Sequence, residues 1–341
     1  MVDLEIKPLV SIIITSFNRE KFIEMAIQSA LNQDYPNLEI IISDNNSTDN
    51  SDTIIKKYIH DKRIKYFVND VNIGMLPNFR KAFFELAKGD YITNISSDDY
   101  LIDNKFISSS IDIINSQKNI LLVFGRYYTT YENITKNNFS PVPFYYSKKT
   151  RAGLEVFFDF PKYPYFGWGG CLLNRNKLKD AKIGISDSVT GDIEANLKMM
   201  LLGDVGFVNR NVYVIRAHSQ NETSRPRTAK DVIEGRINMF DNIQKMYRTI
   251  YGTDEKIEQW RFRMLKKDTR DYLIHFLLTN KKNEYNELIK YFSKHNNDIF
   301  HSVLCTDLKY MFVKYLIIPI IKVNLLRRFA HFLFPKKIFF Q

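Results

Sequence analysis

Two runs of β-branched residues, each followed directly by polar turn-forming residues, constrain the fold of this chain more than any other feature. The first run, LVSIIIT at residues 9–15, leads into SFNR, and the second, EIII at residues 39–42, leads into SDNNS. Strands buried on both faces of a parallel α/β sheet appear as continuous apolar runs, and ligands bind beyond their carboxyl ends. We therefore expect a ligand site at residues 15–19 and 43–47.

Strand and helix patterns alternate through the first part of the chain. Apolar runs typical of strands are separated by stretches in which apolar residues recur at helical spacing. The predicted strands are residues 9–15, 40–43, 64–68 and 91–95, and the predicted helices between them are residues 20–32, 49–58 and 76–87. This alternation predicts a doubly wound, mostly parallel α/β sheet with helices on both faces.

The pattern changes after residue 125, where the polar, aromatic and prolyl residues 127–149 predict a long loop. A helix near residues 192–202 and strands at 205–208 and 212–216 close the α/β part. From residue 229 onward only helical patterns occur. We expect an α/β domain at residues 1–228, with halves 1–125 and 126–228, and a helical region at residues 229–341.

Composition and charge limit the classes of partner. The 341 residues carry a formal net charge of +11 with a pI near 9.3, which admits nucleic acid, an anionic small substrate or an anionic membrane surface. No zinc-finger spacing and no RNP-like strand occurs, and the first two hundred residues contain no compact basic helix. We therefore do not expect nucleic acid as a partner.

Cysteine content and the N-terminal residues indicate the compartment. The two cysteines, Cys171 and Cys305, are too few for a disulfide framework. The N-terminal residues include acids and lead straight into a strand, so no secretory signal peptide is expected. We therefore expect a cytoplasmic protein.

Asp44, at the end of the second predicted strand, is the first candidate ligand-binding residue. An ionised carboxylate only accepts hydrogen bonds, so it can accept the imide N–H of a uracil or thymine ring. Phe17 offers a ring face on which a base can stack. The alternative is that Asp44 opens an Asx turn in SDNNSTD; its position at a strand end favours a ligand.

A pair of acids, Asp98 and Asp99, follows the fourth predicted strand. Carboxylates at a strand end suit a divalent cation that also bridges two phosphates, because Mg²⁺ and Mn²⁺ favour oxygen ligands and keep open positions for substrate. The alternative is a capping turn before the helix that begins near Lys105.

Four segments together resemble one known family. They are a strand followed by TSFNR, a strand followed by SDNNSTD, the loop Asn72-Ile73-Gly74, and a strand followed by SSDD. With these separations, over residues 8–224, they are similar to the inverting glycosyltransferases of family 2, which have the GT-A fold. The resemblance implies that residues 1–125 bind the nucleotide sugar and residues 126–228 bind the acceptor.

The resemblance also implies roles around the donor. The nucleotide-binding residues would be Thr15, Phe17, Arg19, Asp44, Asn72, Asp98 and Asp99. In the family an Asp-x-Asp element contacts the metal and the ribose. Here its first acidic position is Ser96, so the usual ribose contact of that acid stays open, and Asp98 fits the metal-binding place, although a shift of one residue would exchange Asp98 and Asp99.

Asp192 matches the start of the family's segment that begins with its catalytic base. The positive end of a helix dipole favours the ionised carboxylate at a helix start, so Asp192 would be ready to accept a proton. A plain helix N-cap is the alternative role. Glu194 lies two residues on, and therefore on another helix face, and is the weaker candidate.

Two further segments resemble parts of the family's site. Arg216 and His218 match an Arg-x-His that ends the catalytic domain, where His218 would ligate the metal or contact the diphosphate and Arg216 would offset phosphate charge. A structural histidine is the alternative. Trp168 and Gly169 lie where the family places the floor of the acceptor site, and a buried core aromatic is the alternative for Trp168.

The tail, residues 308–340, is strongly apolar but is interrupted by lysines, arginines and Pro319. A spanning helix needs about 20 predominantly apolar residues, so the pattern favours a basic amphipathic helix on an anionic membrane surface. A dimerisation or core-packing helix is the alternative, and a homo-oligomer is one of the expected partners.

The sequence therefore predicts a glycosyltransferase that transfers a sugar from a nucleotide-diphospho donor, which we expect to be UDP-linked, to a hydroxyl of a glycan acceptor with inversion. Mn²⁺ or Mg²⁺ is the expected cofactor, and the acceptor is expected to be lipid-linked, at the inner face of the plasma membrane. Two alternatives remain open. One is a nucleotidyltransferase, although TSFNRE lacks the glycine-rich loop such enzymes use, and the other is an inactive nucleotide-sugar-binding module, which Ser96 favours.

Overall fold

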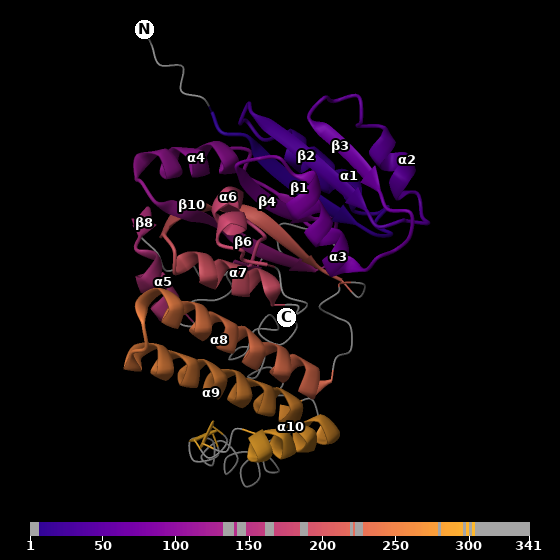
Figure 1. Cartoon of the computed structure of the whole chain (residues 1–341). Helices are drawn as coiled ribbons and strands as arrows, with labels where there is room; N and C mark the ends of the chain where they lie inside the picture. The colour runs from indigo at the N-terminus through magenta and orange to yellow at the C-terminus, as the bar shows by residue number, and fades with distance from the viewer. Residues whose placement is uncertain are drawn as a thin grey trace. The chain divides into compact units, whose positions relative to one another are not determined.

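The computed structural model describes residues 7–131, 140–141, 148–160, 167–184, 190–218, 221, 228–278, 281–295, 298–299 and 302–303. The chain forms two compact units (Figure 1). The first comprises Met1–Asp187 and Gly191–His218, and the second comprises Ser188–Thr190 and Ser219–Gln341. The predicted amphipathic tail at residues 308–340 lies outside the described residues.

The first four strands of the first unit are parallel, as the alternating pattern predicts. They are β1 (Val10–Ser16), β2 (Leu38–Asp44), β3 (Ile64–Val68) and β4 (Tyr91–Ser96), in the order β3-β2-β1-β4. In this register Thr15 lies opposite Ser43 on one side and Ser96 on the other. The polar residues that end these strands therefore meet at one edge of the sheet.

The second half of the sheet is mixed rather than parallel. The order continues with β9 (Cys171–Asn174), β6 (Ile120–Tyr131), β10 (Asp204–Ala217) and β5 (Tyr100–Leu101), and the short β7 (Ser140–Pro141) and β8 (Thr150–Arg151) pair with β6 and β10. β10 is parallel to β6, whereas β9 and β5 pair antiparallel with their neighbours. These antiparallel neighbours make this half of the sheet mixed.

The two strands predicted at residues 205–208 and 212–216 form the single strand β10. Its pairing with β6 shifts register between Val208 and Asn211 and again between Asn211 and Tyr213. An irregularity of this kind bends a strand and re-aims its side chains. The far half of β10 pairs with β5, the strand that directly follows Asp99, and so brings the end of β10 to the acidic pair.

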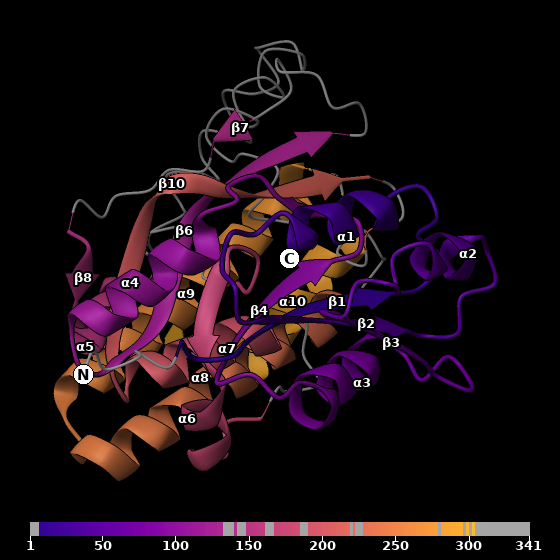
Figure 2. The same cartoon turned by 90° about the horizontal axis from the view of Figure 1, so that it is seen from above.

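Helices cover both faces of the sheet. α1 (Ile23–Leu31) and α3 (Met75–Arg80) lie on opposite faces of β1 and β2 (Figure 2). The helix predicted at residues 76–87 is α-helical only in its first part and continues as a π-helix, η1 (Lys81–Leu86). The other helices of this unit are α2 (Ser51–Lys56), α4 (Phe106–Ser116), α5 (Gly153–Asp159), α6 (Arg175–Asp180) and α7 (Gly191–Met200).

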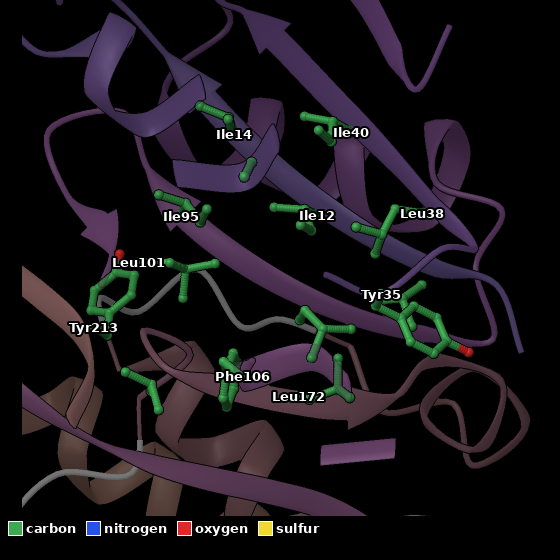
Figure 3. Close-up of a cluster of buried hydrophobic side chains, with 14 of the residues drawn as sticks. Ile12, Ile14, Tyr35, Leu38, Ile40, Ile95, Leu101, Phe106, Leu172 and Tyr213 are labelled. Atoms are coloured by element: carbon green, nitrogen blue, oxygen red, sulfur yellow. The ribbon is translucent and has the colours of Figure 1, made fainter. Parts of the chain in front are cut away.

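The main core lies between the sheet and the helices α1 and α4. Ile12, Ile14, Ile40 and Ile95 come from alternate positions of three adjacent strands and lie in one cluster with Phe106 of α4 (Figure 3). Each is fully buried, which stabilises the fold by about 1.5–3 kcal/mol per side chain. Because this face requires every second residue of β1, the strand register is fixed.

A buried carboxylate on the other face joins the strands at their amino ends. Glu39 of β2 accepts hydrogen bonds from the Ser11 hydroxyl (2.6 Å), the Lys88 amide (2.6 Å), the Gly89 amide (3.1 Å) and the Lys65 ammonium (2.7 Å). Burial alone would raise the pKa of Glu39, but the hydrogen bonds from Lys65, Ser11 and Lys88 lower it. The carboxylate therefore stabilises the turn before β4 only while it is ionised.

Replacing Glu39 by Gln should lower the free energy of unfolding by about 2–3 kcal/mol at neutral pH, because a charged acceptor of four donors is lost. Since the pKa is lower in the folded state, this contribution is present above the unfolded value of about 4.3 and is lost as pH falls through the folded value. Urea denaturation at several pH values measures the difference. The exposed Glu85→Gln serves as the control, and an equal effect of both variants would contradict the prediction.

The second unit is helical in its described residues, as predicted. α8 (Ala229–Tyr251), α9 (Glu255–Leu278) and α10 (Lys282–His295) contact one another. Gly252, at φ 80°, ends α8, and the Phe240 and Trp260 rings meet edge to face at 5.7 Å. Within the part of the chain that the structure describes, no helix has the length and apolar character that crossing a membrane requires.

Candidate active site

The loops after β1 and β2 interlock at the sheet edge. Asn18 and Asn46 adopt left-handed backbone angles (φ 52° and 63°), which asparagine tolerates better than most residues and which turn each loop sharply. The Asn18 amide donates to the Ser47 hydroxyl (2.9 Å), and the Asn18 side-chain oxygen accepts from the Thr48 amide (2.8 Å). The polar residues of both motifs therefore hold each loop in place against the other.

Further bonds extend this interlocking to the start of α2. The Glu20 amide donates to Asp49 Oδ2 (2.9 Å), while Glu20 Oε2 accepts from the Asn50 amide (3.0 Å). The Arg19 amide donates to the Ser51 hydroxyl (3.0 Å). Because each loop donates to and accepts from the other, the position of Arg19 depends on the second loop as well as on its own strand.

Asp44 lies at the end of β2 with 1% of its surface exposed. Its Oδ1 accepts from the amide (3.1 Å) and the hydroxyl (2.6 Å) of Ser47, and its Oδ2 accepts from the Tyr66 hydroxyl (3.2 Å). Burial raises the pKa of Asp44, and the hydrogen bonds of Ser47 and Tyr66 oppose the rise. An Asx turn would use the amide two residues on, whereas the amide that Asp44 binds lies three residues on, and this local hydrogen bonding uses one carboxylate oxygen.

The loop after β3 contacts the second loop through amide side chains. Asn72 is exposed, and its side-chain oxygen accepts from Asn45 Nδ2 (2.7 Å) and from the Gly74 amide (2.9 Å). Gly74 adopts φ 90°, which favours glycine at this turn. Thr15 and Phe17, at the end of β1, are half-buried. These predicted nucleotide residues thus surround the edge where β1, β2 and β3 end.

Asp98 and His218, 120 residues apart in the chain, are brought into direct contact. His218 Nε2 lies 3.1 Å from Asp98 Oδ2, and Arg19 Nε lies 3.5 Å from the same oxygen. Burial alone would raise the pKa of Asp98, but the hydrogen bond with His218 and the charge of Arg19 lower it. The His218 ring stacks on Phe22 at a centroid distance of 4.8 Å, which fixes its plane.

Asp99 accepts hydrogen bonds from two residues of β10. Its Oδ2 accepts from the Tyr213 hydroxyl (2.9 Å), and its Oδ1 accepts from the Arg216 amide (2.8 Å). Burial and the charge of Asp98 raise the pKa of Asp99. The acid thus anchors the end of β10, and its predicted contact with the nucleotide stays a prediction.

Tyr213 is a site residue that the sequence does not reveal. Its hydroxyl accepts from the Ser96 amide (3.2 Å) and donates to Asp99, so it joins the ends of β4 and β10. In the sequence it lies inside the apolar run VYVI, which carries no sign of a polar role. Gly169 permits its close approach, because a Cβ at this glycine would lie 2.7 Å from the Tyr213 ring.

The Arg216 guanidinium lies over two aromatic rings. Its Cζ is 4.8 Å from the centroid of Phe22 and 5.4 Å from that of Tyr100. Burial lowers the pKa of Arg216. The stacked cation is therefore positioned beside the acidic pair, within the same aromatic layer that orients His218.

Asp192 is the second residue of α7, where the helix dipole favours a negative charge. Its Oδ1 lies 2.8 Å from the Ile193 amide. The neighbouring candidate Glu194 is buried and accepts a hydrogen bond from the Lys198 ammonium (2.6 Å), four residues on. Glu194 therefore forms an ion pair within α7, which weakens its case as a base.

Trp168 is 3% exposed, so its indole offers little free face to a sugar. It stacks on Phe83 (4.8 Å) and packs against Phe79 (4.9 Å), and its Nε1 donates to Asn196 Oδ1 (2.9 Å). Asn196 lies one turn after Asp192 and on the same face of α7. In this arrangement Trp168 orients the helix that carries Asp192.

Asp98 and His218 can supply only part of the ligands that a divalent cation needs. The described residues contain no group of three or more His, Cys, Asp or Glu side chains that could coordinate a metal. A carboxylate and an imidazole side by side still fit Mn²⁺ or Mg²⁺ if a bound diphosphate and water supply the other ligands.

Comparison with known proteins identifies the family. The model of the family described as Glycosyl transferase family 2 matches residues 11–181, which contain the interlocked loops and the acidic pair. The chain belongs to this family. It is 38% identical over 135 residues to an Escherichia coli protein named UDP-Glc:alpha-D-GlcNAc-diphosphoundecaprenol beta-1,3-glucosyltransferase WfaP, which covers 40% of this chain and 52% of that protein. The chain thus spans about half the length of such curated relatives.

Solved structures agree on the fold. S. aureus TarS 1-349 in complex with UDP-GlcNAc superposes with a TM-score of 0.59 at 16% identity and covers 84% of this chain and 92% of that one. A mannosyltransferase from Pyrobaculum calidifontis in complex with GDP-Man and Mn²⁺ gives a TM-score of 0.51 at 12% identity, with 89% and 80% covered. The predicted GT-A fold of this family 2 member is confirmed.

Replacing Trp168 by Phe should lower the free energy of unfolding by about 1 kcal/mol beyond the packing loss, because the buried Asn196 oxygen loses its donor. A double-mutant cycle with Asn196→Leu isolates this contribution. In the Asn196→Leu background the indole N–H has lost its acceptor, so Trp168→Phe should cost only the packing loss there. Chemical denaturation measures all four proteins. Additive losses would show that the hydrogen bond does not stabilise α7.

Proposed function

We propose that this family 2 member transfers a sugar from a UDP-sugar donor to a hydroxyl of a glycan acceptor, with inversion and with help from a divalent cation. The observation that carries the proposal is the convergence of Asp98, His218 and Arg19 at the sheet edge beside the loop of Asp44. This edge offers an acceptor for a base, cations for a diphosphate and ligands for a metal. The crystal structure of the structural neighbour TarS is of a complex with UDP-GlcNAc.

In the proposed donor site, Asp44 accepts the imide N–H of uracil through Oδ2 while Phe17 stacks on the base. Thr15, Asn72 and Asp99 complete the nucleotide site. Arg19 is a guanidinium near the acidic pair, and such a group binds phosphate oxygens well because its donors form a planar fork. Its Nη1 donates to the backbone oxygens of Phe17 (3.2 Å) and Asn18 (3.0 Å), and its Nε lies 3.5 Å from Asp98, so the guanidinium is held at the edge where the diphosphate is proposed to bind.

Asp98 and His218 are the residues that would hold Mn²⁺ or Mg²⁺. Such an ion, when bound, neutralises charge on the leaving diphosphate. The chain's own cations act at the same place, since Arg216 is fixed between Phe22 and Tyr100 next to Asp99. The structure of the mannosyltransferase neighbour in complex with GDP-Man and Mn²⁺ supports the choice of metal.

In the proposed reaction Asp192 accepts the proton of the acceptor hydroxyl. The oxygen attacks the anomeric carbon from the face opposite the diphosphate, so the new bond forms as the old bond breaks and configuration inverts. Asp192 suits this role because it lies in the first turn of α7, where the ionised form is favoured, and Trp168 holds that helix through Asn196. Gly169, beside Trp168, remains a proposed part of the acceptor site.

The proposed acceptor is a lipid-linked glycan at the inner face of the plasma membrane. WfaP, the E. coli relative, is named for a diphosphoundecaprenol-linked acceptor. The net charge of +11 supports attraction to an anionic surface. The basic amphipathic tail at residues 308–340 is the segment proposed to bind that surface, in a cytoplasmic, peripheral protein.

Asp192→Asn should reduce sugar transfer by about 10²–10⁴-fold, because general-base catalysis typically contributes that much. UDP-sugar affinity and melting temperature should stay close to wild type, since the amide keeps the shape of the side chain. Transfer assays with UDP-sugars and an undecaprenyl-type acceptor measure the change. Glu194→Gln is the matched control on the same helix and should keep most activity; if it loses more than Asp192→Asn, the base is Glu194.

Removal of divalent metal should abolish transfer, and Mn²⁺ or Mg²⁺ should restore it. Asp98→Asn should bind Mn²⁺ at least about tenfold more weakly in the presence of UDP, because an oxygen ligand loses its charge. Titration calorimetry of Mn²⁺ into the UDP complex measures this directly. Full transfer in excess EDTA would exclude the proposed metal.

A further inference from the structure

Tyr66 of β3 has a hydroxyl that lies between two carboxylates. Its oxygen is 3.2 Å from Asp44 Oδ2 and 3.0 Å from Asp52 Oδ1 on α2. Asp52 also accepts from the Lys56 ammonium through its other oxygen (2.7 Å). Tyr66 is half-buried and Lys56 is exposed, so a chain of contacts leads from the proposed base acceptor to the surface of α2.

A phenol has one proton to donate, but both neighbours of Tyr66 are acceptors when ionised. If the proton points to Asp44, that carboxylate gains a donor. If it points to Asp52, a lone pair of Tyr66 faces Asp44 Oδ2, and this contact is favourable only when Asp44 carries a proton of its own. The direction of the Tyr66 O–H and the protonation of Asp44 are therefore linked.

The two oxygens of Asp44 are not equivalent. Oδ1 accepts both the amide and the hydroxyl of Ser47, whereas the described contact of Oδ2 is with Tyr66. A base that approaches Asp44 therefore meets Oδ2. An ionised Oδ2 accepts a ring N–H, as in uracil, while a protonated carboxyl offers an O–H that suits a ring nitrogen acceptor, as in cytosine.

We propose that Tyr66 is a specificity-determining residue that keeps Asp44 an acceptor, so that the site selects a base with a ring N–H over one with a ring nitrogen acceptor. The inference rests on the proposed binding of the base by Asp44. Lys56 supports this role at a distance: it offsets the charge of Asp52, and the Tyr66 proton is then attracted more strongly to Asp44.

The charged groups around Asp44 act in the same direction. Burial and the charge of Asp49 raise the pKa of Asp44, so the site needs a donor to keep the carboxylate ionised. The pKa of Asp52 is lowered by the hydrogen bond from Lys56. Tyr66, whose pKa is raised by burial and by the charges of Asp44 and Asp52, keeps its proton and serves as that donor.

The test measures the ratio of the CDP and UDP dissociation constants by calorimetry at several pH values between about 8 and 5.5. Burial and the loss of a hydrogen bond both favour the protonated form of the Asp44 carboxyl, so a change in its protonation is sought in this range. The two nucleotides share the same diphosphate, so any pH dependence of diphosphate binding cancels in the ratio. We expect a constant preference for UDP in the wild type. In Tyr66→Phe the preference should fall at least about fivefold toward low pH, because Asp44 becomes protonated.

Three further variants separate this role from a structural one. Lys56→Ala, at the surface, should shift the ratio in the same direction as Tyr66→Phe but less, whereas Asp52→Asn should keep the wild-type profile. Tyr58→Phe is the matched control, because it removes a hydroxyl that bonds Glu24 and Gln28 between α1 and α2. It should also keep the wild-type profile.

The role of Tyr66 would be overturned if the ratio of dissociation constants depends on pH in Tyr66→Phe as it does in the wild type while Asp44→Ala abolishes the UDP preference. The proposed base site would then remain intact. A Lys56→Ala profile that shifts toward UDP at low pH would overturn the role of Tyr66 as well. If Asp44→Ala leaves the ratio unchanged, Asp44 does not bind the base, and both the proposed donor site and this inference fail together.

Discussion

The register of β1 between β2 and β4 is the constraint on which the rest of the structure depends. β1 is buried on both faces, with isoleucines in the α1 core on one side and Ser11 bonded to Glu39 on the other. A slip by one residue would exchange the two faces, burying polar groups in the isoleucine core. The register that avoids this also aligns Thr15, Ser43 and Ser96, and so defines the edge where the site forms.

That edge gathers three buried carboxylates, and each is stabilised in a different way. Asp98 lies beside His218 and Arg19, and the hydrogen bond with His218 and the charge of the guanidinium lower its pKa against the effect of burial. Asp99 is surrounded by a hydroxyl and a backbone amide, and its pKa is raised by burial and by Asp98. Asp44 lies between these cases: among the described residues its hydrogen-bond donors are neutral, so its protonation is the most sensitive to a nearby hydroxyl.

The same edge shows why aromatic residues matter for charged ones. Phe22 contacts both the ring of His218 and the guanidinium of Arg216, and Tyr213 joins Ser96 to Asp99. Long flexible cations lose conformational freedom when they bind a ligand. Stacking of Arg216 on rigid rings restricts its guanidinium in the free protein, which reduces that cost at the proposed diphosphate site.

The sequence by itself determined the local features. Continuous β-branched runs fixed the four parallel strands, the polar residues after them fixed the loops, and the motif spacing gave the family, because each of these depends on neighbours in the chain. Asp44 and Asp98 became candidate site residues because they follow predicted strands, and His218 became one through the resemblance. The roles assigned to them, and the boundary between domains at residue 228, remain predictions.

Only the tertiary structure decided which distant residues meet. The contact of Asp98 with His218 depends on β10 bending and pairing with β5, and neither the bend nor the pairing leaves a periodic signal. Tyr213, Tyr66 and the anchoring of α7 by Trp168 were likewise invisible, since their hydrogen bonds join segments that are tens of residues apart. The periodicity of the sequence indicates which face of a strand or helix a side chain lies on. The residue that it contacts there depends on how the whole sheet packs.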